Sequence, residues 1–190
     1  MNRTNLLAAL AASLAILPAA AEMESYTVDP RHTIPTYEVS HFGYSMQRGR
    51  FGKTSGKITL DTAAKKGSAD IAMETASVST GVDKLDEHLR SEDFLNAAKF
   101  PQITFKSTDF AFEGDKVKSA TGDLTINGVT RPVTFTANVF RCAMNPMLKK
   151  KQCGADLQTT IKRSDFGMKY GLPMLGDDVT LRIPVESMKD

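Results

Sequence analysis

The chain has 190 residues, with 24 Lys and Arg against 22 Asp and Glu, so its formal net charge at pH 7 is only +2. This near balance, without a large basic stripe, argues against nucleic acid as a partner. The length is enough for one domain with a sizeable core. Trp is absent, but ten Phe residues are available for that core.

The N-terminal segment has the features of a secretory signal peptide. Arg3 gives a positive start, residues 6–17 form an apolar run, and residues 19–21 are three alanines that supply a small-residue cleavage site. No Cys follows this site, which argues against a lipoprotein anchor. We therefore expect residues 1–21 to be removed on export and residues 22–190 to form one domain.

Alternating apolar and polar residues recur along the rest of the chain. This period of two predicts antiparallel strands with one buried face. Eight such strands suit a closed barrel better than a flat sandwich, because closure removes exposed edges. We therefore predict an all-β fold, an eight-stranded antiparallel β-barrel about 25 Å tall. The predicted strands are residues 34–42, 50–61, 67–78, 101–112, 115–127, 129–141, 153–165 and 178–187.

One segment, residues 82–95, breaks the alternation. Leu85 and Leu89 are four positions apart, as on one face of a helix, and Asp83 is a suitable N-cap residue. The segment predicts a helical insert, either a short helix or two short turns, that covers one side of the barrel.

Asn127 and Gly128 stand between two alternating runs, and this pair predicts a two-residue type I′ hairpin turn. Such a turn pairs Ile126 with Val129 and places the apolar residues of both arms on one face. Arg131 is the charged exception on that face, and we expect it near the rim of the barrel.

Cys142 and Cys153 are the two cysteines of the chain, and an isolated pair in an exported protein predicts a disulfide. The alternation of side chains along the two strands complicates this prediction. It turns Cys142 toward the outside of the barrel and Cys153 toward the inside. Residues that lie directly opposite each other on neighbouring strands must share a face. Either a bulge intervenes, with Gly154 as its natural site, or the cysteines lie beyond the strand ladder at the base of the loop. Two reduced thiols are the remaining alternative.

His32, His41 and His88 are the obvious candidates for catalysis or metal binding, but they show none of the spacings of known metal motifs. The serines have no nucleophile-elbow context, and the carboxylates of residues 83–93 fit a solvated helix face. The sequence thus offers no convincing catalytic set, and we expect no catalytic residue, metal or cofactor.

The inward positions of the predicted strands are apolar and differ in size. The larger ones that we expect to line the interior are Tyr37, Phe105, Ile126, Phe135 and Ile161. Small inward residues such as Ala137 leave room for a channel, unless larger neighbours fill the gap. His41 and Arg131 are expected near a mouth, where a polar group of a ligand would find a partner.

Five motifs stand out along the chain: YTVDPRHT at 26–33, VSTGVDKLDEHLRSEDF at 78–94, FPQITF at 100–105, GDLTINGVTRPV at 122–133 and TIKRSDFG at 160–167. Together they resemble the YceI-like family, the periplasmic polyisoprenoid-binding proteins. Several ordered motifs at fitting spacings are far more specific than any single one, and they extend over nearly the whole mature chain.

The resemblance implies a lipocalin-like barrel with a helical insert, a periplasmic location and no established enzymatic activity. It also implies an elongated apolar pore that holds an isoprenoid chain of the polyprenyl or quinone type, or another long amphiphile. We therefore expect a binding or carrier protein whose partner is such a lipid, and not an enzyme.

Two other functions stay open on the sequence alone. One is a metal enzyme that uses the three histidines, and the other is a stress-related structural module with a fully packed barrel and no ligand. For a carrier, the loop between the cysteines is a candidate for membrane contact, since it combines apolar and basic residues that suit an anionic surface. These residues are Met147, Leu148, Lys149, Lys150 and Lys151; otherwise the loop tip is simply solvated.

Overall fold

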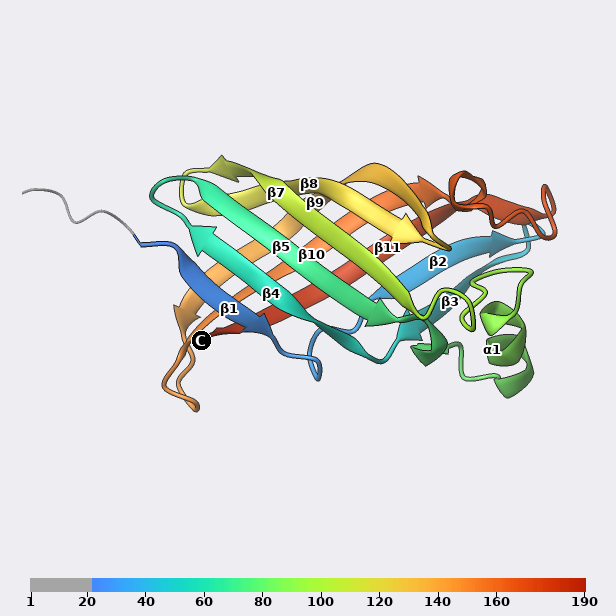
Figure 1. The fold of residues 1–190 in the computed structure, drawn as a ribbon, viewed down its shortest axis with the longest axis horizontal. Helices are drawn as coiled ribbons and strands as arrows, with labels where there is room; N and C mark the ends of the chain where they lie inside the picture. The colour runs from blue at the N-terminus through green and yellow to red at the C-terminus, as the bar shows by residue number, and fades with distance from the viewer. Residues whose placement is uncertain (1–21) are drawn as a thin grey trace, which may run out of the picture.

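The computed structural model describes residues 22–190, and the predicted signal peptide lies outside the described residues. Eight antiparallel strands close into a barrel, in the order β1-β4-β5-β7-β8-β9-β10-β11 and back to β1. A short helix, α1 (Asp83–Arg90), lies at one end (Figure 1). The predicted fold class, an eight-stranded antiparallel barrel with a helical insert, is confirmed.

The shortest strand, β1, closes the ring. Its residue Tyr26 lies opposite Ile58 of β4 on one side and opposite Lys189 of β11 on the other. Tyr26 and Val28 alternate with exposed residues and are almost fully buried, so this five-residue strand is held by its inward face. The strands of the ring are β1 (Glu24–Val28), β4 (Thr54–Asp61), β5 (Lys66–Glu74), β7 (Gln102–Glu113), β8 (Lys116–Ile126), β9 (Val129–Met144), β10 (Lys151–Lys162) and β11 (Leu175–Lys189).

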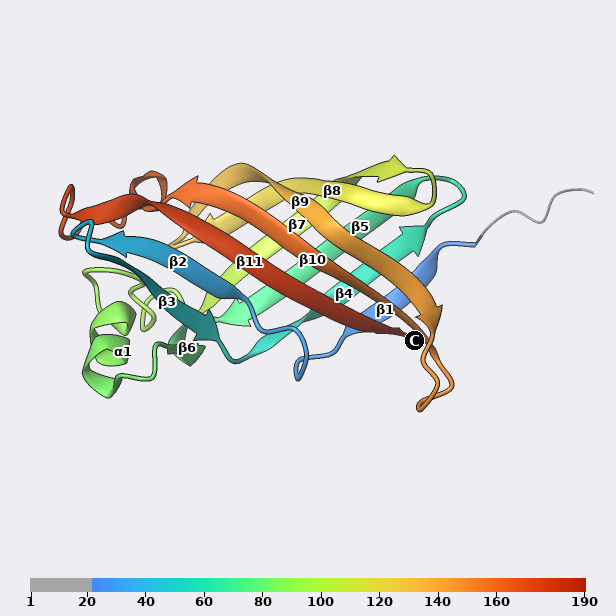
Figure 2. The same ribbon diagram turned by 180° about the vertical axis from the view of Figure 1, so that it is seen from behind.

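The membership of the ring differs from the prediction. The predicted first strand corresponds to β2 (Thr36–His41), which pairs with the first half of β11 and with β3 (Ser45–Phe51). Figure 2 shows β2 beside β11 and β3 on the other side of β2. A two-residue strand, β6 (Val78–Ser79), pairs with β3 after the 3-10 turn η1 (Thr75–Ser77). The sequence prediction missed β1 and β3, and the first four residues of β3 are all exposed, so β3 lacks a clear alternation.

Two clusters of buried apolar residues pack inside the barrel. One lies toward α1 and includes Phe51, Leu124 and Phe166. The other is formed by Tyr26, Leu60, Val117 and Cys153, near the turns that join β4 to β5, β7 to β8 and β9 to β10. This second cluster packs the end of the barrel that lies away from α1 (Figure 1), which we call the closed end.

The two cysteines are joined by a disulfide, as predicted. Cys142 and Cys153 lie directly opposite each other within the β9–β10 ladder, so they do not lie beyond it. A bulge solves the problem of strand phase, but it lies at Asn138 and not at Gly154. The register passes from Asp156 opposite Val139 to Leu157 opposite Ala137, which leaves Asn138 as the extra residue. The bulge turns Cys142 toward the closed-end cluster.

The predicted hairpin turn is confirmed. Asn127 and Gly128 both have positive φ angles, 52° and 71°, and Ile126 lies opposite Val129. The helix start was predicted less well, since Val82 is the N-cap residue and Asp83 is the first residue of α1. Within the described part of the chain, no helix is both long enough and apolar enough to cross a membrane.

Candidate functional site

An apolar cavity of about 390 Å³ lies inside the barrel on the α1 side of its interior. Its volume falls within the range of about 300–1,000 Å³ that is usual for pockets that bind small molecules. Aliphatic and aromatic residues from β2, β5, β7, β8, β10 and β11 form most of its wall, and α1 adds Leu85 and Leu89. The helical insert therefore covers one side of the cavity, as its apolar face predicted.

The five large residues predicted to line the interior all line this cavity: Tyr37, Phe105, Ile126, Phe135 and Ile161. Phe105 and Phe135 meet edge to face with ring centroids 5.0 Å apart. Burial raises the pKa of the Tyr37 phenol to about 12, so this residue stays neutral at physiological pH. The cavity wall is thus uncharged over these strands, which suits an apolar ligand.

The mouth of the cavity lies at the α1 end. His41, Gln47 and Leu85 line the cavity and are also exposed to solvent. The closed-end residues Tyr26 and Cys153 are not part of the lining formed by the described residues. The cavity therefore opens at one end of the barrel, and His41 is among the residues at this mouth.

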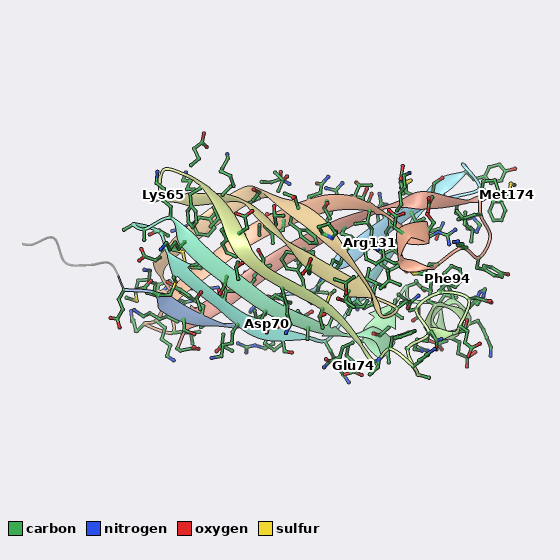
Figure 3. The ribbon with its side chains drawn as sticks, turned by 45° about the horizontal axis from the view of Figure 1, so that its top comes forward. Lys65, Asp70, Glu74, Phe94, Arg131 and Met174 are labelled. Carbon is green, nitrogen blue, oxygen red and sulfur yellow. A yellow bond between two sulfur atoms is a disulfide. The ribbon has the colours of Figure 1, made fainter. Side chains whose placement is uncertain are left out.

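Arg131 and Ala137 do not join the lining that residues 22–190 form. Ala137 is buried next to the bulge in β9. Arg131 is exposed on the barrel wall (Figure 3), in the part of β9 that pairs with β8. Arg131 lies opposite Leu124 in the β8–β9 ladder, so the two residues share a face, but β9 meets β10 only from Thr136 onward and the Arg131 side chain is exposed to solvent.

Several lining residues were missing from the predicted site. Leu157, Leu181 and Ile183 belong to the alternating runs of β10 and β11, so strand phase was a sufficient signal for them. Arg163, in the 3-10 turn η2 (Arg163–Phe166), and Met168, in the loop behind it, also reach the cavity. This segment has no strand periodicity, and the sequence contained no signal for its position.

Arg163 is a buried cation in this otherwise apolar wall. Its guanidinium donates hydrogen bonds to three backbone carbonyl oxygens, those of Met168 at 2.9 Å, Leu175 at 3.1 Å and Gly176 at 2.8 Å. The carbonyl groups of Leu175 and Gly176 lie where the register of β11 against β2 shifts. Burial lowers the pKa of Arg163, opposed by the charge of Asp177. The residue thus fixes the backbone of the loop beside the mouth.

We expect Arg163→Met to destabilise the protein by about 2–4 kcal/mol, because three buried carbonyl oxygens lose their donor. Lys162→Met is the matched control, since the ion pair of Lys162 with Asp178 is exposed on both sides and contributes little to stability. Urea unfolding of both variants measures the difference. Equal stability of the two variants would show that Arg163 does not fix the loop.

The three histidines do not form a metal site. His32 Nδ1 is 2.8 Å from Asp29, His41 is at the mouth, and His88 Nε2 is 2.9 Å from Asp93. Among the described residues, no three His, Cys, Asp or Glu side chains are grouped as metal ligands would be. The geometry therefore gives no support to a metal enzyme, and the open cavity argues against a fully packed module.

The loop predicted to touch a membrane lies at the closed end of the barrel. Met147 and Leu148 at its tip are exposed. Lys151 and Lys189, at the start and end of their strands, both form ion pairs with Glu24. Hydrogen bonds from Lys151 and then Lys189 lower the pKa of Glu24 to about 2. One of the three predicted membrane-binding lysines is thus already paired within the fold.

Comparison with known proteins agrees with this architecture. The chain is 37% identical over 192 residues to protein YceI of Escherichia coli O6:H1, covering 98% of each. The crystal structure of Burkholderia cenocepacia BcnA superimposes with a TM-score of 0.72 at 26% identity, over 84% of this chain and 98% of BcnA. A polyisoprenoid-binding domain from Saccharophagus degradans shares the fold, with a TM-score of 0.63 at 15% identity over 88% of this chain and 99% of that domain. The model of the YceI-like domain matches residues 26–187, and the chain belongs to this family.

Proposed function

We propose that the protein binds and carries one long-chain isoprenoid lipid, of the polyprenyl or quinone type or a similar amphiphile, inside the barrel. The observation that carries this proposal is the apolar cavity that is open at one end and closed at the other. A lipid tail would enter past His41 and extend along the wall toward Phe135, while its polar head stays near the mouth. The chain acts here as a binding protein and not as an enzyme.

The free energy of binding a lipid tail inside the cavity is favourable. Burial of about fifteen CH₂ groups contributes roughly 12 kcal/mol before the cost of association is subtracted. No charged anchor is needed for such binding. The fold shared with the Saccharophagus degradans domain, which is described as polyisoprenoid-binding, is consistent with the same kind of ligand.

We place this function in the periplasm. The disulfide between Cys142 and Cys153 suits an oxidising compartment, and the predicted signal peptide would direct export. A carrier in this compartment has to meet a membrane in order to load or release its lipid. The loop of residues 145–150 is one candidate surface, although it lies at the end away from the mouth.

The test is to purify the exported protein from a bacterial periplasm and to analyse its extracted lipids by mass spectrometry. We expect up to one long-chain isoprenoid or similar amphiphile per protein, and we expect the emptied protein to take up a polyprenol or ubiquinone in titration. Protein that carries no apolar chain and takes up none would contradict the proposal.

A further inference from the structure

Exposed apolar side chains gather around the mouth of the cavity. Twelve large apolar side chains within residues 22–190 are exposed, and seven of them belong to the segments that surround the mouth. Five of the seven lie on two segments, residues 42–46 at the tip of the β2–β3 hairpin and residues 168–175 before and at the start of β11. These five, which we call the mouth rim, are Phe42, Tyr44, Met46, Tyr170 and Met174. Figure 3 shows Met174 at the extreme end of the molecule.

The two segments of the mouth rim are held together as one surface. The backbone N–H of Phe42 donates to the carbonyl oxygen of Met174 at 3.0 Å, and His41 lies opposite Leu175 in the strand ladder. Tyr170 packs edge to face against His88, with ring centroids 5.0 Å apart. The exposed side chains are therefore presented from a fixed backbone and not from free loops.

The side chains of the mouth rim are strongly exposed to solvent, and Tyr44 is the most exposed of them. It is 90% exposed, and Met174 is 59% exposed. Apolar side chains that gather on one face of a soluble protein indicate an interaction site. Tyr, which carries a polar hydroxyl on an apolar ring, is one of the side chains enriched at the boundary between lipid and water.

The charge of the mouth rim indicates which partner it fits. Residues 41–50 and 168–175 contain Arg48, Arg50 and Lys169 and no Asp or Glu. Arg48 forms an ion pair with Glu38 of β2 at 3.1 Å, so Lys169 and Arg50 supply the net positive charge of these segments. The part of the mouth around α1, against which Tyr170 packs, carries Asp83, Glu87, Glu92 and Asp93, so the basic charge is confined to the β2–β3 and 168–175 segments. A symmetric dimer through the rim would bring basic side chains against each other, whereas the head groups of anionic phospholipids carry the complementary charge.

We propose that the mouth rim docks on the surface of an anionic phospholipid bilayer, with Tyr44 and Met174 inserted among the head groups. The mouth of the cavity then faces the bilayer, and an apolar chain passes between bilayer and barrel without crossing water. The choice of a bilayer as the partner rests on the proposed carrier function. The docking itself depends on the rim and not on a bound lipid.

The test is flotation of the mature protein with vesicles of phosphatidylethanolamine and phosphatidylglycerol, compared with vesicles of phosphatidylcholine alone. We expect binding to the anionic vesicles and a loss of about tenfold or more in the Tyr44→Ser, Met174→Ser double variant, because two apolar side chains no longer insert. Lys169→Gln should weaken binding to the anionic vesicles by about fivefold.

The matched control is Met147→Ser with Leu148→Ser, which removes two exposed apolar side chains at the closed end. This control should bind like the wild type. Equal binding by wild type and the rim variant, or a loss confined to the closed-end variant, would overturn the proposal. So would a dimer in solution that Tyr44→Ser dissociates. Thermal unfolding confirms that each variant is folded.

Lipid occupancy separates this proposal from the carrier function. Tyr44 and Met174 do not line the cavity that the described residues form, so the rim variant should still take up a polyprenol in detergent. If wild type docks on vesicles but takes up no apolar chain, the carrier function fails and the docking surface stands. If it takes up the chain but shows no preference for anionic vesicles, the docking surface fails alone.

Discussion

Phe135→Asp is expected to lose its bound lipid and to be destabilised by at least about 3–5 kcal/mol. The Phe135 side chain is only 2% exposed and meets Phe105 edge to face. Removal of the ring alone costs about 3–5 kcal/mol. A carboxylate in its place would be buried without a partner, which adds to this cost or forces the group to stay protonated. Urea unfolding and mass spectrometry of extracted lipid measure the two effects.

A gentler substitution separates lipid binding from folding. Ile183 lines the cavity and is only half-buried, so Ile183→Phe fills part of the space while keeping the wall apolar. We expect a folded protein with clearly reduced lipid occupancy. Val139→Phe is the matched control, because it adds the same ring to an exposed position of β9. Equal occupancy in the two variants would show that the cavity is not the lipid site.

Replacement of both cysteines by alanine is expected to lower the free energy of unfolding by about 3 kcal/mol, since the disulfide closes a short loop in the unfolded chain. The sequence separation of Cys142 and Cys153 is 11. For a domain of this size the loss corresponds to a fall in Tm of roughly 6–12 °C. Thermal unfolding with and without a reductant measures it.

The location of the disulfide adds a second expectation. Cys153 packs in the closed-end cluster, away from the mouth, so the folded alanine variant should bind lipid as the wild type does. Reductant should lower the Tm of the wild type and leave that of the variant unchanged. If the disulfide of the wild type is fully reduced and its Tm does not change, the disulfide does not stabilise the protein.

Much of the cavity wall could be predicted from the sequence because a strand side chain alternates strictly between two faces. Tyr37, Phe105 and Ile161 were found from this alternation alone, and all three line the cavity. Arg131, the charged exception on its face, is exposed and does not line the cavity, in the part of β9 that pairs with β8 and has not yet met β10. Alternation gives the face of a strand, but the neighbouring strands decide whether that face is enclosed.

The sequence by itself determined the local features of this protein: the strands with a clear period of two, the type I′ turn at Asn127 and Gly128, the apolar face of α1 and the pairing of the two cysteines. Each depends on residues that are close in the chain or on the chemistry of a single pair. Only the tertiary structure decided how the ring closes through β1, where the bulge at Asn138 lies, and how Arg163 fixes the loop beside the mouth. These features depend on register between distant strands and on backbone carbonyl groups, which have the same chemistry in every residue and leave no pattern in the sequence.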